Sequence, residues 1–287
     1  KWAISARGFN GRYANKLLVQ QDGRTLYTPL YSGTYWDVQN IPLEDIERIE
    51  VVRGPGATLW GANAVNGVIN IITRSAHDTQ GGLAILDVGG QERLRGGVRY
   101  GGVLGENGSY RIHASGHRHG KGVRFDGTPA DDDWQDRRVG FRTDFDLSKR
   151  DSLTVQGDLY RGEAGATVVE GISANAEQAQ TSGGNLLARW KRRLDKDAGL
   201  ELQVYFDRTE RDNWSLRERR NTFDIDWLHY FGVGEHHNLV WGAGFRHTAD
   251  DIKVVPDGVL TFAATRRGDN TFSAFLQDDI ALFDNRF

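Results

Sequence analysis

From Gly82 to the end of this 287-residue chain, apolar and polar residues alternate one by one over long segments. Phe141, Thr143 and Phe145, for example, alternate with Arg142 and Asp144. A helix cannot place every second residue on one face, whereas a strand does so by its geometry. The alternation therefore predicts about ten strands, near residues 83–89, 93–104, 109–118, 136–147, 152–161, 185–194, 200–210, 220–231, 238–247 and 270–282.

The connections between these segments fall into two length classes that alternate along the chain. Short connections lie near residues 105–108, 148–151, 195–199 and 232–236, and long ones lie near residues 120–134, 162–184, 212–219 and 249–269. The first link, near residues 89–92, is a short exception. Tight turns at one end and long loops at the other are typical of outer-membrane barrels. A soluble β-sandwich also alternates, but long strands whose polar faces are rich in Arg and Asp favour a membrane barrel.

The composition argues against several classes of protein. No run of about 18 apolar residues is present, so a transmembrane helix is excluded. The mean hydropathy of −0.55 suits either a soluble domain or a barrel wall with a polar inner face. The chain has no Cys, which argues against a disulfide scaffold and thiolate chemistry. A net charge of −3 gives no basic field that would indicate nucleic acid as a partner.

Residues 1–75 have a different, glycine-punctuated pattern. Two strand-like runs, 46–52 and 68–73, flank a loop that contains Gly54, Pro55, Gly56 and Gly61. A phosphate-binding loop is not supported, because neither a GK[ST] ending nor a long helix follows. Two further strands are predicted at 16–21 and 24–27 around the turn pair Asp22-Gly23, and a short helix begins at Pro42. The polar stretch 75–82 marks the domain boundary.

The order and spacing of motifs in residues 1–75 resemble the plug domain of TonB-dependent outer-membrane receptors. The motifs are Arg7-Gly8-Phe9, Leu18-Val19 with Asp22-Gly23-Arg24, Pro42-Leu43-Glu44-Asp45-Ile46, Ile49-Glu50-Val51-Val52-Arg53-Gly54-Pro55, Trp60-Gly61-Ala62 and Gly67-Val68-Ile69-Asn70-Ile71-Ile72. The resemblance implies a mainly β fold: a small mixed α/β plug domain in residues 1–75, then antiparallel transmembrane β-barrel strands in residues 82–287. About ten strands of an expected 22 or so are present, and the TonB box is absent, so we expect a receptor fragment. An open sheet leaves two unpaired edges, and we therefore expect it to be stable only within the complete chain.

The same resemblance implies which plug residues meet the ligand and which hold the plug. Tyr31, Tyr35 and Trp36 in one apical loop, and Leu59 and Trp60 in another, become candidates for substrate binding. Aromatic rings offer large contact area at little entropic cost, although packing of the plug against the barrel would explain them equally well. In addition, Arg7 and Arg53 match plug arginines that pair with barrel carboxylates and so latch the plug in place.

No catalytic constellation is recognisable, so the chain is not expected to be an enzyme or to carry an intrinsic cofactor or metal. His113, His117 and His119 share one strand face, where polar residues lining a wet lumen are a better explanation than a metal or haem site. The carboxylates of Asp131, Asp132 and Asp133 could hold calcium, but they lack the interleaved ligand spacing and are expected to be solvated. His236-His237 falls in a predicted short turn and is expected to be solvated too.

The resemblance implies active transport of a scarce, bulky nutrient across the outer membrane of a Gram-negative bacterium. The foremost cargo is a ferric siderophore, and the implied partners are TonB with its inner-membrane energising complex and the lipid of the outer membrane. Cobalamin, haem, another metal chelate or a glycan remain alternative cargoes. A passive porin-like or surface-binding barrel and a soluble all-β binding domain are the alternatives from other classes, and the plug argues against the open pore.

Overall fold

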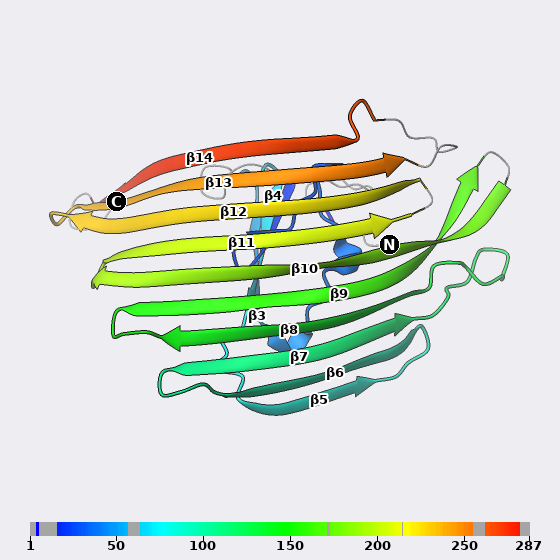
Figure 1. Cartoon of the computed structure of the whole chain (residues 1–287), viewed down its shortest axis with the longest axis horizontal. Coiled ribbons are helices and arrows are strands. Elements are labelled where there is room, and N and C mark those ends of the chain that lie inside the picture. Colours follow the sequence, from blue (N-terminus) through cyan, green and yellow to red (C-terminus); the bar gives the residue numbers. More distant parts are fainter. Residues whose placement is uncertain are drawn as a thin grey trace.

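The computed structural model describes residues 4–5, 16–56, 64–170, 173–213, 215–254 and 262–281, and side chains are not described for residues 166–177. These residues form two sheets. A four-stranded sheet with the order β2-β1-β4-β3 lies against one face of a ten-stranded sheet that runs in sequence order from β5 to β14 (Figure 1). The fold is therefore mainly β, as predicted, with a small N-terminal unit and a long antiparallel sheet.

We call the N-terminal unit built around the small sheet the plug. It contains the elements expected from the sequence. They are β1 (Leu17–Gln21), β2 (Arg24–Thr25), η1 (Trp36–Val38), η2 (Leu43–Asp45), β3 (Ile46–Arg53) and β4 (Gly67–Thr73). Strands β1 and β4 pair in parallel, whereas β3 pairs with β4 in the antiparallel sense. The helix predicted at Pro42 is a single 3-10 turn, in which Pro42 caps η2 and Asp45 closes it. Helical content in the plug is thus limited to two short turns among its described residues.

The hairpin predicted at Asp22-Gly23 is present and connects β1 to β2. Both residues have positive φ angles, +49° and +79°, as a two-residue hairpin turn of this type requires. The Asp22 carboxylate accepts hydrogen bonds from the backbone N–H and the hydroxyl of Thr73, both at 2.9 Å. A further hydrogen bond, at 2.8 Å from Gln156 in the long sheet, ties the turn to the wall behind it.

The long sheet, which we call the barrel wall, contains all ten predicted strands. They are β5 (Gly81–Asp87), β6 (Glu92–Val103), β7 (Gly108–His119), β8 (Trp134–Asp146), β9 (Asp151–Glu170), β10 (Ser173–Asp195), β11 (Ala198–Asp212), β12 (Leu216–Val233), β13 (His237–Val254) and β14 (Arg266–Ile280). Every neighbouring pair is antiparallel. We call the end at which residues 120–133 join β7 to β8 the long-loop end, and the opposite end, where residues 147–150 join β8 to β9, the short-turn end.

Two of the predicted long connections are wrong. Residues 162–184 were expected to be a loop, but β9 continues to Glu170 and β10 begins at Ser173, and these two residues pair directly. Similarly, the connection expected at residues 212–219 is short, because β12 begins at Leu216. The reason is that inter-strand hydrogen bonds join backbone groups, so a ladder can extend beyond the point where side-chain alternation fades.

Burial in the barrel wall is inverted relative to a soluble domain. Apolar side chains such as Val98, Leu159 and Leu186 are more than half exposed on the outer face. By contrast, Arg220 and Asp224 are buried on the inner face. This is the arrangement of a barrel that presents apolar residues to lipid and polar residues to its lumen. Among the described residues, no helix is sufficiently long and apolar to cross a bilayer.

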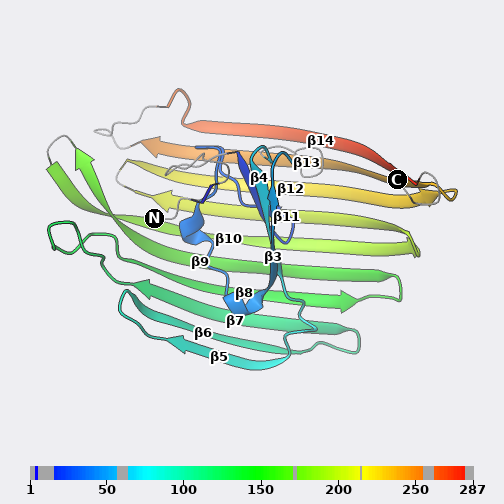
Figure 2. The same ribbon diagram turned by 180° about the vertical axis from the view of Figure 1, so that it is seen from behind.

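The plug lies on the polar inner face, and its own strands run across the long strands (Figure 2). Its apolar core is small. One cluster joins Leu17, Val19 and Leu26, with Trp36 packed against it, and a second cluster joins Leu18, Ala64 and Val68. The linker from the plug to β5 is also fixed to the wall, because the Ala76 N–H donates to the Asp144 carboxylate at 2.7 Å. Polar contacts with the wall therefore add to this apolar core in holding the described part of the plug.

Candidate functional site

The plug is joined to the barrel wall by buried ion pairs, and Asp45 forms the most enclosed of them. Asp45 closes η2, and its side chain is only 2% exposed. Its Oδ1 accepts a hydrogen bond from Arg99 Nη1 at 2.6 Å, and its Oδ2 lies 3.6 Å from Arg111 Nε and 3.8 Å from His113 Nδ1. One plug carboxylate therefore compensates two buried arginines on adjacent strands, β6 and β7.

A second ion pair has the opposite polarity. Arg24 of β2 donates to the Asp207 carboxylate of β11, and both side chains are largely buried. The neighbouring plug residue, Thr25, accepts a hydrogen bond from Arg246 of β13 at 3.2 Å. Side chains of β11 and β13 therefore hold the β1–β2 hairpin, in addition to Gln156 of β9 at its turn.

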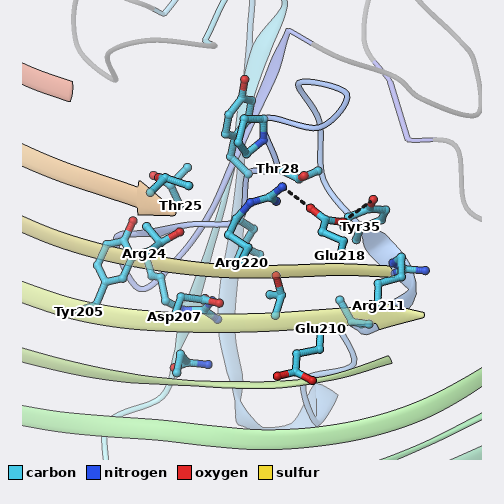
Figure 3. Close-up of a pocket in the computed structure, with 18 of the residues that line it drawn as sticks. Arg24, Thr25, Thr28, Tyr35, Tyr205, Asp207, Glu210, Arg211, Glu218 and Arg220 are labelled. Atoms are coloured by element: carbon cyan, nitrogen blue, oxygen red, sulfur yellow. Dashed lines mark hydrogen bonds and ion pairs between the residues drawn. The ribbon is translucent and has the colours of Figure 1, made fainter. Parts of the chain in front are cut away.

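The third attachment holds η1 and the loop before it, where two of the predicted aromatic residues, Tyr31 and Tyr35, lie. Arg211 of β11 donates to both oxygens of Asp37, at 2.7 and 2.9 Å, in a fork geometry that is among the stronger polar contacts. The same guanidinium stacks 4.0 Å above the ring of Tyr35. In addition, the Tyr35 hydroxyl donates to Glu218 of β12 at 3.1 Å (Figure 3).

Burial and the neighbouring Glu218 carboxylate both raise the pKa of the Tyr35 phenol above its ordinary value. The phenol consequently stays protonated and acts as the hydrogen-bond donor to Glu218. Glu218 also accepts a hydrogen bond from Arg220, whose Nε contacts Asp250 of β13 at 2.6 Å. A continuous chain of polar contacts thus runs from the plug loop across three residues of the wall.

A cavity of about 450 Å³ lies between this loop, the β1–β2 hairpin and the barrel wall (Figure 3). Its volume is within the range of small-molecule sites. Strands β11 to β14 contribute to the cavity from the halves that lie nearer the long-loop end, for example with Arg211, Arg220, Thr248 and Asn270. The Tyr35 side of the plug therefore borders a polar cavity that lies nearer the long-loop end of the wall.

The predicted ligand-contact residues have different surroundings. Tyr35 lines the cavity, and Tyr31 packs edge-on against it with ring centroids 5.1 Å apart. Trp36 instead packs against the plug cluster that contains Leu17. Leu59 and Trp60 lie outside the described residues, so their predicted contact with ligand stays a prediction, as does that of the tyrosines.

The predicted latch arginines, Arg7 and Arg53, are not among the residues whose contacts with the wall are described. Arg53 is the last residue of β3 and is exposed, and Arg7 lies outside the described residues. Their pairing with barrel carboxylates stays a prediction. What the sequence reasoning missed is the reverse arrangement, in which plug carboxylates, Asp37 and Asp45, meet barrel arginines. The only sequence signal was the density of Arg and Asp on inward-facing strand positions, and that signal does not identify partners.

The histidine and aspartate clusters singled out from the sequence have protein partners. His113 is near Asp45, and His117 Nδ1 is 3.6 Å from Asp136. His119 stacks on the ring of Trp134, with centroids 5.7 Å apart. Across the described ranges, no group of three or more His, Asp or Glu residues has the arrangement of a metal site.

The sequence predicts a solvated acidic loop, but the structure shows that carboxylates of this loop also contact neighbouring residues. Asp131 pairs with Lys121 at 3.2 Å and with Arg124 at 2.6 Å, and Asp132 accepts the Gly122 N–H at 2.7 Å. These contacts stay within residues 121–132 and close the loop on itself. Of the turn histidines, His237 forms a 2.7 Å contact with Asp278.

Comparison with known proteins finds relatives of the N-terminal part of the chain and structures that share the fold of both sheets. Residues 2–68 match the family model described as the TonB-dependent Receptor Plug Domain. The vitamin B12 transporter BtuB of Vibrio cholerae is 36% identical over 134 residues, which cover 47% of this chain and 21% of the relative. The ferric enterobactin receptor of Pseudomonas aeruginosa is 39% identical over 87 residues, which cover 28% of this chain and 11% of the relative.

Two solved structures share the whole arrangement of plug and wall. The ferric citrate transporter FecA superimposes with a TM-score of 0.71 at 17% identity, covering 97% of this chain and 47% of FecA. The siderophore receptor PirA of Pseudomonas aeruginosa superimposes with a TM-score of 0.67 at 18% identity, covering 94% of this chain and 46% of PirA. The chain therefore spans about half the length of these structures, and its aligned region spans less than a quarter of the curated relatives.

Proposed function

Since the chain belongs with the TonB-dependent outer-membrane receptors, we propose that it provides the plug and the first part of the barrel of a receptor for active nutrient uptake. The proposed cargo is a scarce, bulky compound, foremost a ferric siderophore, which crosses the outer membrane of a Gram-negative bacterium. The observation that carries this proposal is the plug itself: it is fixed to the polar face of the barrel wall by buried ion pairs and borders a cavity nearer the long-loop end.

The geometry supports gated transport in preference to chemistry. The cavity at Tyr35 receives the ligand, and the contacts of Asp37, Asp45 and Arg24 with the wall keep the plug in place when no force acts. Energy supplied through TonB is then needed to exchange these contacts and open a path. No bond of the cargo is made or broken, and the chain supplies no cofactor of its own.

The plug attachments argue against a passive channel. Removing one partner of a buried ion pair is strongly destabilising, because the other charge is left buried without compensation. Arg211 adds a bidentate contact with Asp37. A barrel that worked as an open pore would gain nothing from a domain held across its lumen in this way. Movement of the plug therefore belongs to the proposed transport cycle.

The test is uptake of radiolabelled ligands by cells that produce the full-length receptor, with and without functional TonB. The panel contains ferric siderophores, haem, cobalamin, a further metal chelate and an oligosaccharide, and direct binding to the purified receptor is measured in parallel. Accumulation of one ligand only when TonB is functional supports the proposal and names the cargo. Equal entry of small solutes irrespective of TonB would refute it and favour a passive channel.

A further inference from the structure

The charged side chains that line the cavity are all paired with opposite charges. The cationic lining residues are Arg24, Arg138, Arg211, Arg220, Arg246 and Arg267, and the acidic ones are Asp158, Asp207, Glu210, Glu218 and Asp269. Each of these residues has an oppositely charged partner within 4 Å. The described wall of the cavity therefore presents no uncompensated charge to a ligand.

This compensation is built into the register of the strands. Arg220 of β12 is directly opposite Asp250 of β13, which in turn is opposite Arg267 of β14. In the same way, Asp224 of β12 is opposite Arg246 of β13. Opposite charges on directly paired residues attract each other. Part of the charge compensation thus comes from the register of the wall strands, and part comes from the plug, through the pairs of Arg24 with Asp207 and of Arg211 with Asp37.

Between the ion pairs, the cavity wall is rich in neutral hydrogen-bonding groups. Seven threonines line it: Thr25, Thr28, Thr181, Thr209, Thr222, Thr248 and Thr271. Three side-chain amides, of Gln39, Asn185 and Asn270, and the hydroxyl of Tyr160 also lie there. Thr222 and Thr248 are paired across β12 and β13, so the two threonines are neighbours in the lining. Hydroxyl and amide groups can donate and accept hydrogen bonds without carrying charge.

Binding of an anionic ligand to this lining is expected to be unfavourable. To bind an arginine it would have to displace the carboxylate already paired with it, which leaves a buried carboxylate without a partner. A ligand without net charge avoids that cost, since it can bond to the threonine and amide groups and leave the ion pairs intact. The lining therefore discriminates between chelates by charge.

We propose that this cavity takes an electroneutral ligand rich in amide or hydroxamate groups, and that it rejects multiply anionic chelates. The inference rests on the proposed function and specifies the chemical class of its cargo. A ferric trihydroxamate or a cobalamin has the required neutral, amide-bearing surface. A ferric triscatecholate, ferric citrate or haem carries negative charge and is disfavoured.

The test measures binding of the five probes named above to the full-length receptor, at low and at high salt. Screening shortens the reach of charges from about 10 Å at 0.1 M salt to about 3 Å at 1 M. We expect a neutral probe to bind more tightly than every anionic probe, with an affinity that changes less than about twofold between the two salt concentrations. Preferred binding of an anionic probe, with affinity that falls steeply as salt rises, overturns the inference.

Two substitutions test the mechanism of selection. Thr222→Val removes a hydroxyl at nearly constant size, and we expect it to weaken binding of the neutral probe by roughly two- to tenfold. Asp269→Asn removes the carboxylate that pairs with Arg267 at the cavity, and we expect it to improve binding of the anionic probes several-fold. The matched control is Asp278→Asn on the same strand, because Asp278 pairs with His237 away from the cavity and its loss should leave selectivity unchanged. No change with Thr222→Val and Asp269→Asn overturns the inference.

The outcomes separate this inference from the proposed function. TonB-dependent uptake of an anionic chelate in preference to the neutral ones leaves the transporter intact and refutes only the charge selection. Failure of every probe in the panel to bind or to accumulate refutes the proposed function itself.

Discussion

Replacement of Asp45 by asparagine should loosen the plug without unfolding the barrel wall. The substitution keeps the size of the side chain and removes the plug carboxylate that lies within 4 Å of both Arg99 and Arg111. Arg111 is 4% exposed and Arg99 is 16% exposed, so neither guanidinium can regain full hydration. Loss of one partner of a buried ion pair costs roughly 3–5 kcal/mol.

We expect the lower end of that range, about 3 kcal/mol, because the new amide oxygen can still accept a hydrogen bond from Arg99. At about 1.4 kcal/mol for each factor of ten, this raises the equilibrium population of the detached plug about a hundredfold. Hydrogen exchange of the backbone amides of β1 and β4 in the full-length receptor measures that population. Amides of β10 and β11 serve as an internal reference for the wall.

The matched control is Glu47→Gln, which removes a plug carboxylate from an exposed pair with Arg48. Exposed pairs contribute little because water and salt screen them, so exchange in β1 and β4 should stay at the level of the unmodified receptor. If Asp45→Asn and Glu47→Gln gave the same exchange rates, burial of the ion pair would not be what holds the plug, and the reasoning would fail.

Three further perturbations test other parts of the structure. Gly23→Ala should destabilise the plug by more than about 1 kcal/mol, because φ is +79° and an added Cβ would lie 2.8 Å from wall side chains. Gly105→Ala, at a φ of +69° in open space, should cost only about 1 kcal/mol. Equal losses of stability in a denaturant titration would contradict this expectation. Tyr35→Phe removes the hydroxyl that bonds to Glu218, and it should raise local hydrogen exchange of the loop roughly five- to tenfold, while an unchanged rate would show that the contact does not restrain the loop. Leu186→Arg places a charge on the apolar outer face and should reduce barrel stability in lipid by about 2–4 kcal/mol. Leu186→Ala is the control, and an equal effect of both substitutions would argue against lipid contact at this position.

The sequence by itself determined the order and type of nearly all elements. Strict alternation leaves a strand as the only way to place residues such as Phe141 and Phe145 on one face, and every predicted strand is present. The turn at Asp22-Gly23 was equally predictable, because few residue pairs tolerate two positive φ angles. These features depend on near neighbours in the chain, so local chemistry is enough to identify them.

Tertiary structure alone decided how far the strands extend and which charges meet. The β9–β10 ladder continues beyond the visible alternation because its stability comes from backbone pairing between neighbours. Arg24 and Asp207 are 183 residues apart, and only the placement of the plug across the wall brings them together. A polar alternation indicates that arginines and carboxylates face inward, but the register of each strand and the position of the plug select their partners. That selection is what gives the cavity its compensated charge.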